Sequence, residues 1–279
     1  HHPSPMLYPF HQVDVFSDEP LLGNPLAVVH RSDPFADPSA TSSTESSTEP
    51  SAESSPDPAN EPDNLPARFA RWTNLSETTF LLRPTHPEAD YRVRIFTPES
   101  ELPFAGHPTL GTCHAWLEAG GRPRSPHQIV QECPAGLIRI RKDADRLAFA
   151  APPLLRTGPV DPPLLDRLAA ALGIPRTRIH GHQWVDNGPG WLALLLDSAD
   201  TVLSLTPDHA ALSDVKLGVI GPYPSGGPAD FEVRAFVGPL GVPEDPVTGS
   251  LSAGIAQWLL PAGLAAAPYT VSQGTLLHR

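Results

Sequence analysis

A pattern that occurs twice constrains the fold of this chain more than any other feature. Val93-Arg94-Ile95-Phe96 is followed after a loop by His107-Pro108-x-x-Gly111-Thr112, and Val233-Arg234-Ala235-Phe236 is followed by Asp245-Pro246-x-x-Gly249-Ser250. Each copy predicts a strand, a loop and a helix whose N-cap is His107 or Asp245, because proline suits the first helical position. The repeat therefore predicts two similar halves. Each half presents a helix N-terminus, which is a site where anions bind.

Length and charge limit what the chain can do. Its 279 residues suit two domains of ordinary size, and 40% apolar residues are enough for their cores. The formal net charge is −12, but eight acidic residues and no Lys or Arg lie between residues 33 and 64, so the remainder carries only −12 + 8 = −4. Without a basic stripe, we expect no nucleic-acid partner. No apolar run approaches the roughly 20 residues of a membrane span, and the start of the chain lacks the pattern of a signal peptide, so we expect a soluble, cytoplasmic protein. His1 and His2 are interpreted as remnants of an expression tag, which would make Met6 the native start.

Residues 33–64 differ in character from the rest of the chain. They are rich in Ser, Thr, Pro and acidic residues and contain almost no large apolar side chains. Acidic residues recur at every fourth position from Glu45 to Glu61, but the residues between them have low helix propensity. We expect a disordered insertion, with an acidic binding element as the alternative.

Hydrophobic periodicity and turn residues predict the other elements. We expect strands at 7–16, 26–29, 78–82, 91–96 and 191–196, a hairpin of the second half from 129–140 and 146–150, and helices at 65–73 and 164–172. The helix at 65–73 places Leu65, Phe69 and Trp72 on one face. Gly111 and Gly249, one turn into the two repeated helices, each cost roughly 1 kcal/mol relative to alanine, so a ligand or a facing helix is expected to pack closely there.

The sequence predicts no metal and no cofactor. Cys113 and Cys133 form neither a disulfide framework nor a metal knuckle, and His180-Gly181-His182 has no acidic or cysteine partner nearby in sequence. The chain has no glycine-rich nucleotide loop after a strand, no Walker lysine and no nucleophile elbow. Cys113, inside a predicted helix, is interpreted as a small buried thiol.

Seven short stretches occur in the order typical of one protein family. They are Val13-Asp14-Val15-Phe16, Gly23-Asn24-Pro25-Leu26-Ala27-Val28-Val29, Asn74-Leu75-Ser76-Glu77-Thr78-Thr79-Phe80, Arg94-Ile95-Phe96-Thr97-Pro98, Glu101-Leu102-Pro103-Phe104-Ala105-Gly106-His107-Pro108, Glu244-Asp245-Pro246-Val247-Thr248-Gly249-Ser250 and Ser272-Gln273-Gly274. Together they resemble the phenazine biosynthesis protein F family over nearly the whole chain except residues 33–64.

The resemblance implies an α+β fold of two similar halves, as in the diaminopimelate epimerase-like fold. Each half would be a curled, mostly antiparallel sheet around a central helix, with the active site in the cleft between the halves. We expect an N-terminal half at 6–122 that contains the insertion, a C-terminal half at 123–279, and a homodimer. The family continues with a short strand after Gln273-Gly274, so the end at Arg279 indicates either a trimmed chain or a missing strand.

The resemblance also implies roles for particular residues. Glu77 would be the acid/base, and its hydroxyl and aromatic neighbours would raise its pKa toward the working pH by partial desolvation. His107 and Asp245 would be catalytic groups that contact the ligand, although capping a helix would also explain each of them. The expected substrate-binding residues are Ser76, Gly106, Thr248, Gly249, Ser250 and Gln273.

These parts predict an isomerase that moves a proton, and so a double bond, in a small unsaturated, cyclic carboxylic acid. The resemblance implies a place for this reaction in secondary-metabolite biosynthesis, and the small-molecule carboxylate would be held at the helix N-termini. The alternative is a non-catalytic member of the family that binds a metabolite or a protein. An epimerase or racemase is disfavoured, because two-base epimerases of this fold carry a cysteine near each central helix, where this chain has Gly106-His107 and Pro246-Val247.

Deleting residues 36–62 should leave folding and ligand binding nearly unchanged. A segment with so few apolar groups contributes little buried area. Thermal melting of the deletion variant beside the full chain tests this expectation. A large fall in the melting temperature would show that the segment packs on the fold.

Overall fold

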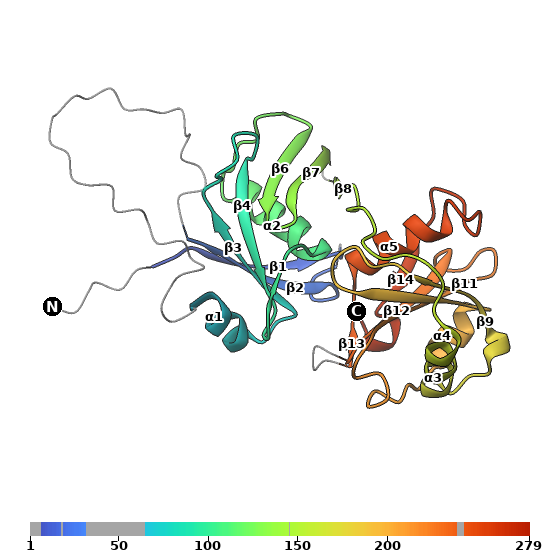
Figure 1. Ribbon diagram of the computed structural model, residues 1–279. Coiled ribbons are helices and arrows are strands. Elements are labelled where there is room, and N and C mark those ends of the chain that lie inside the picture. The colour runs from blue at the N-terminus through green and yellow to red at the C-terminus, as the bar shows by residue number, and fades with distance from the viewer. Residues whose placement is uncertain (1–6, 18, 32–64, 145, 239–242) are drawn as a thin grey trace, which may run out of the picture. The chain divides into compact units, whose positions relative to one another are not determined.

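The computed structural model describes residues 7–17, 19–31, 65–144, 146–238 and 243–279 (Figure 1). The expectations for residues 33–64 fall outside these ranges. Within them, no helix has both the length and the apolar character needed to cross a membrane.

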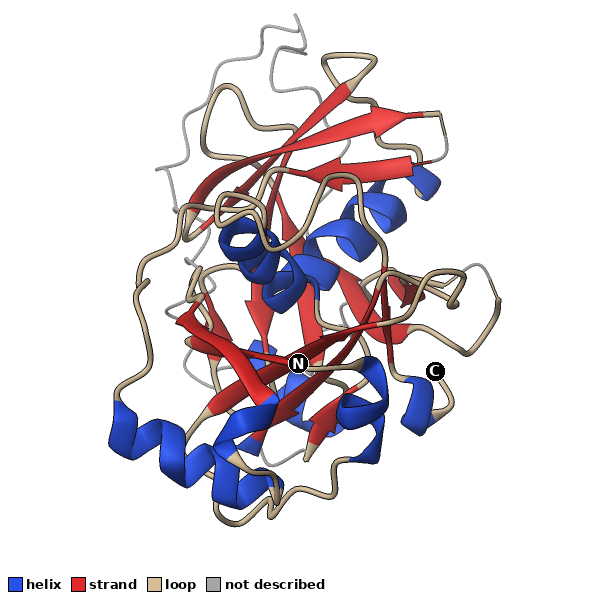
Figure 2. Ribbon diagram, turned by 90° about the vertical axis from the view of Figure 1, so that its right-hand side faces the viewer, coloured by secondary structure: helices blue, strands red, loops and turns tan. Residues whose placement is uncertain are grey.

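The described residues form two compact units, which we treat one at a time. The first contains 7–13, 26–31, 65–102, 111–144 and 146–148, and the second contains 14–17, 19–25, 103–110, 149–238 and 243–279. Each is built on a mixed sheet accompanied by helices (Figure 2).

The first sheet has eight strands in the order β1-β2-β3-β4-β6-β7-β8, with β5 paired to β4. Its elements, with two helices, are β1 (Phe10–Val15), β2 (Asn24–His30), α1 (Leu65–Thr73), β3 (Glu77–Leu82), β4 (Tyr91–Phe96), β5 (Glu101–Leu102), α2 (Gly106–Glu118), β6 (Gln128–Cys133), β7 (Gly136–Asp143) and β8 (Arg146–Phe149).

The second sheet has six strands in the order β13-β12-β11-β10-β9, with β14 paired to β12. Its elements and helices are α3 (Pro162–Leu172), η2 (Arg176–Arg178), β9 (Ile179–Trp184), β10 (Trp191–Leu196), α4 (Ala199–Ser204), β11 (Lys216–Pro222), β12 (Phe231–Val237), β13 (Glu244–Asp245), α5 (Gly249–Leu259), β14 (Val271–Gln273) and η4 (Thr275–Leu277).

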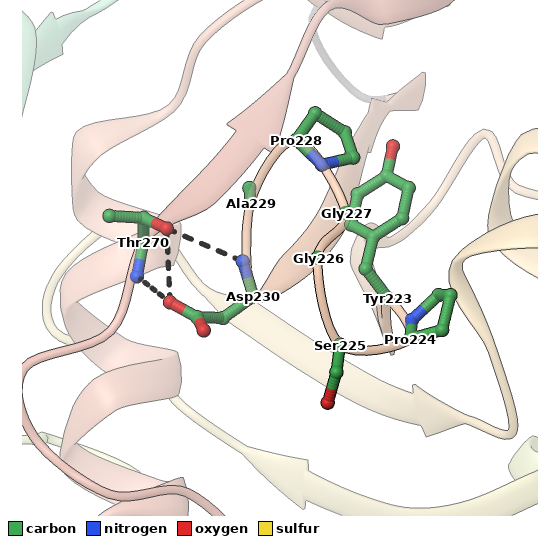
Figure 3. A pocket seen from close by; sticks show the side chains of 9 residues that line it. All are labelled: Tyr223, Pro224, Ser225, Gly226, Gly227, Pro228, Ala229, Asp230 and Thr270. Carbon is green, nitrogen blue, oxygen red and sulfur yellow. Dashed lines mark hydrogen bonds between the residues drawn. The ribbon is translucent and has the colours of Figure 1, made fainter.

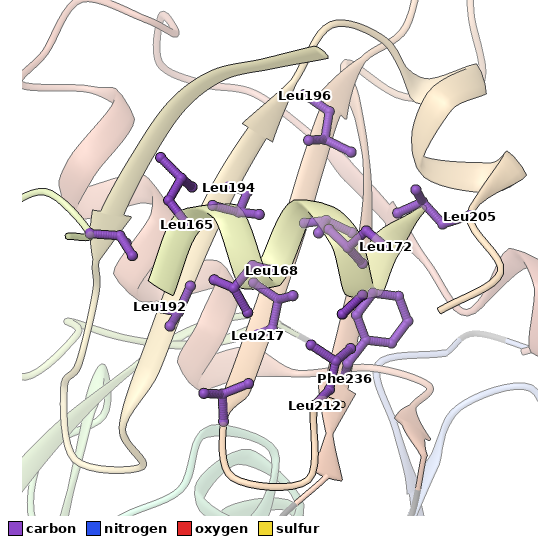
Figure 4. Close-up of a cluster of buried hydrophobic side chains, with 14 of the residues drawn as sticks. Leu165, Leu168, Leu172, Leu192, Leu194, Leu196, Leu205, Leu212, Leu217 and Phe236 are labelled. Carbon is purple, nitrogen blue, oxygen red and sulfur yellow. The ribbon is translucent and has the colours of Figure 1, made fainter. Parts of the chain in front are cut away.

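Strand β10, which lies inside the second sheet, is apolar at every position and is buried on both of its faces. Alternate residues of a strand point to opposite faces, so Leu192 and Leu194 pack with α3 and with Phe236 of β12 (Figure 4). The intervening residues, such as Ala193, pack with α5. The strand at 191–196 and the helix ended by Gly173 are confirmed, with Gly173 in the left-handed conformation at φ 68°.

The two units repeat the same series of elements. β2-α1-β3-β4-β5-α2-β6 corresponds to β10-α4-β11-β12-β13-α5-β14, with the same parallel and antiparallel pairings. The two similar halves expected from the sequence are therefore present.

The register of the repeat differs from the one the sequence indicated. Phe96 pairs with Glu101 as Phe236 pairs with Glu244, and five residues after each glutamate a glycine opens the helix. Gly106 thus corresponds to Gly249, and pairing His107 with Asp245 was wrong. The loop before the glutamate is longer in the second copy, and Pro108 was matched to Pro246 in place of Pro103.

Two further expectations need correction. The helix at 65–73 is present, but Leu65 and Trp72 are exposed, because the small Ala70 is the residue that packs against Phe80 and Phe96. The expected hairpin of the second half is instead β6, β7 and β8 of the first sheet, since β6 returns through α2 to pair with β4 in parallel. The first sheet therefore extends past residue 122.

Candidate active site

The N-cap residue of α5 differs from the one predicted from the sequence. Thr248, not Asp245, is the N-cap residue, and the Asp245 side chain accepts a hydrogen bond from Thr248 Oγ1 at 2.6 Å. The backbone N–H of Thr248 donates to Gln273 Oε1 at 3.0 Å. Asp245 lies on the two-residue strand β13, too early in the chain to cap α5 itself. Its carboxylate acts on the helix start through Thr248.

Two amide side chains complete this network. Gln273 Nε2 donates to the Asp245 carbonyl at 3.0 Å and to Thr248 Oγ1 at 2.9 Å. Asn24 Nδ2 donates to Asp245 Oδ1 at 3.2 Å and to the Val247 carbonyl at 2.9 Å. The structure thus brings together Asp245, Thr248 and Gln273, three of the expected site residues. Asn24 was not among the expected site residues; it is fully buried and is the first residue of β2.

The environment of Asp245 changes its acidity. The pKa of its carboxyl is raised to about 6, mainly by burial. The hydrogen bonds from Thr248 and Asn24 oppose this rise, and the negative charge of Glu244 adds a smaller part of it. Near neutral pH this carboxyl is largely ionised but close to its titration point. Groups with such pKa values are typical of sites that handle protons.

Ser250, in the first turn of α5, is held from two sides. Trp191 Nε1 donates to Ser250 Oγ at 2.9 Å, and Asn187 Nδ2 donates to the Ser250 carbonyl at 2.9 Å. An indole N–H can only donate, so Ser250 Oγ is an acceptor in that bond and its own O–H can donate to a ligand. The sequence had identified Trp191 only as a residue of a buried strand and had not singled out Asn187.

The helix α2 begins against the start of α5, and both segments belong to the second unit. A Cβ at Gly106 would lie 3.0 Å from the Gly249 carbonyl carbon and from the Ser250 nitrogen, and a Cβ at Gly249 would lie 3.4 Å from the His107 nitrogen. A Cβ at Gly106 would therefore crowd the backbone of α5, whereas the tightest neighbour of a Cβ at Gly249 would be the Phe16 ring at 3.1 Å. Two helix N-termini therefore meet at one place, which favours a negatively charged ligand.

His107 lies inside α2 and is not its N-cap, because the helix already begins at Gly106. The side chain is 4% exposed, and burial lowers the pKa of the imidazole to about 3. His107 is therefore neutral at pH 7. In that form it has one N–H that can donate and one ring nitrogen that can accept.

Ser76 and Glu77 lie in the first unit. Glu77 is half-buried and is the first residue of β3, paired with Leu26 of β2, as expected. In the repeat, Lys216 occupies the corresponding position at the start of β11, paired with Trp191. The glutamate is therefore not duplicated. The roles of Ser76 and Glu77 stay predictions.

Comparison with known proteins places the chain in a family. Residues 13–279 match the family model described as phenazine biosynthesis-like protein, PhzC-PhzF. The chain belongs to the PhzC-PhzF family. This confirms the resemblance seen in the sequence, and with it the expectation of a PhzF-family enzyme related to isomerases.

The relatives of this PhzC-PhzF protein include proteins with different names. Antisense-enhancing sequence 1 of Schizosaccharomyces pombe is 36% identical over 97% of this chain and 87% of its own length. A trans-2,3-dihydro-3-hydroxyanthranilate isomerase of Pseudomonas aeruginosa is 32% identical over 88% of this chain and 77% of its own length.

Solved structures support the same fold. A PhzF-family crystal structure from Enterococcus faecalis has a TM-score of 0.69 at 26% identity, covering 96% of this chain and 88% of the other. A probable proline racemase from Agrobacterium radiobacter reaches 0.52 at 13% identity, covering 94% and 79% of the two chains, which shows likeness of fold alone. The expected α+β fold is confirmed.

A cavity of about 270 Å³ lies elsewhere in the second unit, at the turn between β11 and β12 (Figure 3). None of the candidate site residues lines it. Asp230, on its wall, is bound by the backbone N–H of Thr270 at 2.7 Å and by Thr270 Oγ1 at 3.0 Å. The Asp230 carboxylate on the wall of this cavity therefore already accepts hydrogen bonds from Thr270.

The described part of this PhzC-PhzF protein holds no cluster of three or more His, Cys, Asp or Glu residues suited to a metal ion. Cys113 is fully buried, and burial raises the pKa of its thiol to about 12. A thiol with such a pKa stays protonated at pH 7, which agrees with its interpretation as a core residue.

Asp245→Asn should change how stability depends on pH. Because the folded pKa of about 6 lies above the ordinary 3.8, the folded protein holds this proton more tightly, so the aspartate lowers stability as pH rises between these values. Water screens this partly exposed carboxyl, so the variant should gain on the order of 1 kcal/mol relative to the parent between pH 4 and pH 8. Denaturant unfolding at both pH values measures this difference.

Asp214→Asn is the control, because Arg167 holds the pKa of Asp214 below its usual value. That variant should differ from the parent by a nearly constant amount from pH 4 to pH 8, because a lowered pKa changes stability only below the ordinary value of 3.8. A constant difference between Asp245→Asn and the parent at all pH values would show that the pKa of Asp245 is ordinary.

Proposed function

We propose that this chain is a cofactor-independent isomerase that moves a proton and a double bond in a small, unsaturated, cyclic carboxylic acid of secondary metabolism. One observation supports this function most strongly. Two helix N-termini that begin with glycine meet beside a partly buried network that contains Asp245, a carboxyl with a pKa of about 6. Such a place can bind an anion and also handle a proton.

Binding of the substrate carboxylate is the first step of the proposal. The backbone N–H groups in the first turns of α2 and α5 and the Ser250 hydroxyl supply donors. These donors also stabilise the negative charge that spreads into the carboxylate when a neighbouring C–H bond breaks. Gly106 and Gly249 contribute by letting the two helix ends approach.

Proton transfer is assigned to Glu77. Its carboxylate takes a proton from a carbon of the substrate, the electron pair of the broken C–H bond shifts the double bond, and the same proton or one from water is returned at another carbon of the conjugated system. No electron is gained or lost overall, so the step needs no redox partner. Neutral His107 donates or accepts a hydrogen bond, and Asp245 orients the substrate.

The substrate class comes from a relative. The named substrate of the Pseudomonas aeruginosa isomerase, trans-2,3-dihydro-3-hydroxyanthranilate, is a cyclic unsaturated carboxylic acid with C–H bonds next to its double bonds. A compound of this kind fits an anion-binding helix pair with a proton carrier. It is the first compound to assay with this chain.

A homodimer in the cytoplasm that works without metal or nucleotide is part of the proposal, on the basis of the family resemblance. The exposed Leu65 and Trp72 of α1 offer apolar surface that such a contact could cover. Sedimentation at micromolar concentration should show twice the chain mass of 29.8 kDa. A monomer alone would exclude the dimer.

A second candidate function is binding without catalysis. It is favoured by the Schizosaccharomyces pombe relative, which matches 97% of this chain and whose name describes an effect other than isomerisation. A binder would hold the acid at the helix N-termini and return it unchanged. Turnover of any acid by the purified chain decides between the two.

Glu77→Gln should abolish isomerisation and preserve the fold. The amide keeps the shape of the side chain but cannot accept the proton, and loss of a positioned acid/base lowers rates on the order of 10²- to 10⁴-fold. Initial rates with the assayed acid, together with thermal melting, give the result. Binding of 2-aminobenzoate, an aromatic carboxylate that resembles the assayed acid, should be retained, because carboxylate binding is expected to depend on the helix N-termini and not on Glu77.

Glu88→Gln is the matched control, since Glu88 lies on the surface of the same unit in an exposed ion pair with Arg139. It should keep the parent rate. A Glu77→Gln variant with near-parental turnover, or one that is inactive only because it is unfolded, would show that Glu77 is structural.

A further inference from the structure

Two arginine–glutamate pairs occupy equivalent places in the two units, and they differ in burial, because the Glu101 side chain is 32% exposed whereas that of Glu244 is 9% exposed. Arg94 Nε and Nη2 donate to Glu101 at 2.7 and 2.6 Å, and Arg234 Nε and Nη2 donate to Glu244 at 2.9 and 2.8 Å. In both pairs the guanidinium lies over the ring of a phenylalanine two residues later, at 5.0 and 4.9 Å. A fork of two parallel bonds fixes both position and orientation.

Each pair ties a two-residue strand to its neighbour. Glu101 lies on β5 and Glu244 on β13, and each strand begins a five-residue path to the glycine that opens the next helix. Two residues form too few ladder bonds to fix a strand by themselves. The ion pair therefore holds the hairpin from which the helix start is presented.

The second pair differs from the first in the residue next to its glutamate. Leu102 comes directly after Glu101, whereas Asp245 comes directly after Glu244. Arg234 Nη1 also donates to the Val202 and Leu205 carbonyls at 3.2 and 2.9 Å, so this guanidinium is anchored to the end of α4 as well. The Arg234 and Glu244 side chains are 7% and 9% exposed.

We propose that Arg234 and Glu244 are positioning residues for Asp245, which they hold in the network at the start of α5. The negative charge of Glu244, which is paired with Arg234, lies next to Asp245 in the chain. The inference rests on the proposed role of Asp245. The pair contacts no reacting atom, and it acts through the β12–β13 hairpin and through the charge of Glu244.

The groups around Asp245 make this charge effect specific. Asn24 from β2, Thr248 from the cap of α5 and Gln273 from β14 are neutral. Glu244 is the charged group whose field raises the pKa of Asp245, and Arg234 is paired with that same Glu244. Removing the charge of Glu244 should therefore make Asp245 ionise at lower pH.

Glu244→Gln tests the proposal, with Glu101→Gln as the matched control. Both variants break an arginine fork, but only the first changes the charge beside Asp245. The readout is the titration of the Asp245 carboxyl carbon by ¹³C NMR, measured with thermal melting in the full chain. We expect both variants to melt earlier, and only Glu244→Gln to shift the titration to lower pH, by a few tenths of a pH unit or more.

An unchanged titration in a folded Glu244→Gln variant would overturn the proposal, as would an equal shift in Glu101→Gln. If either single variant fails to fold, methionine at both members of the pair avoids an unpaired buried charge, and Arg234→Met/Glu244→Met is compared with Arg94→Met/Glu101→Met. A shift in the same direction, smaller because the positive charge of Arg234 is removed as well, is expected only in the first of these. An Asp245 that titrates as in the parent would then reject the role.

The NMR titration needs no substrate, so the two ideas can fail separately. A shifted titration in a chain that turns over no acid would reject the proposed function and keep the positioning role. Normal turnover in the parent with an unshifted Glu244→Gln titration would do the reverse.

Discussion

The backbone contact between Gly106 and Gly249 is the constraint on which the candidate site depends. A Cβ at Gly106 would lie 3.0 Å from main-chain atoms at the start of α5. A Cβ at Gly249 would lie 3.4 Å from main-chain atoms at the start of α2 and 3.1 Å from the ring of Phe16. Because main-chain atoms cannot turn aside as a flexible side chain does, the contact requires glycine at position 106, whereas a Cβ at Gly249 would meet main-chain atoms at the ordinary distance of 3.4 Å. The result is a pair of helix N-termini close enough to act on one anion.

The rest of the second unit holds that contact in place. The network of Asp245, Thr248 and Gln273 fixes the turn before α5, and Trp191 and Asn187 fix Ser250 just after it. These bonds come from β13, β14 and the β9–β10 turn, elements that are far apart in sequence. Burial of Asp245 in this network disfavours its charged form, which is why its pKa is raised.

Much of this could be predicted from sequence, for identifiable reasons. The strands at 91–96 and 191–196 and the helix at 65–73 were found at the right bounds because their apolar runs end at clear turn residues. The helix starts were misplaced by a few residues because proline is common both in the loop and in the first turn. The repeat then aligned on Pro108 and not on Pro103.

The site was less predictable because its bonds link distant parts of the chain. Asn24 lies 221 residues before Asp245, and no local pattern relates them. The repeat also conceals its differences. The frame of arginine, glutamate and glycine is duplicated, but Asp245 stands where the first copy has Leu102, and Glu77 where the second copy has Lys216. A duplicated frame with unduplicated acids favours one proton carrier over a symmetric two-base site.

The path of one hydrogen atom tests this account most directly. A substrate acid carrying deuterium at the carbon that loses its proton is converted by the chain, and the product is examined by NMR and mass spectrometry. We expect the deuterium to leave that carbon, either for the carbon that gains a proton or for water, in a product that is otherwise an isomer of the substrate. Deuterium that stays on its original carbon, or a product that has lost or gained two hydrogens, would contradict proton transfer by isomerisation.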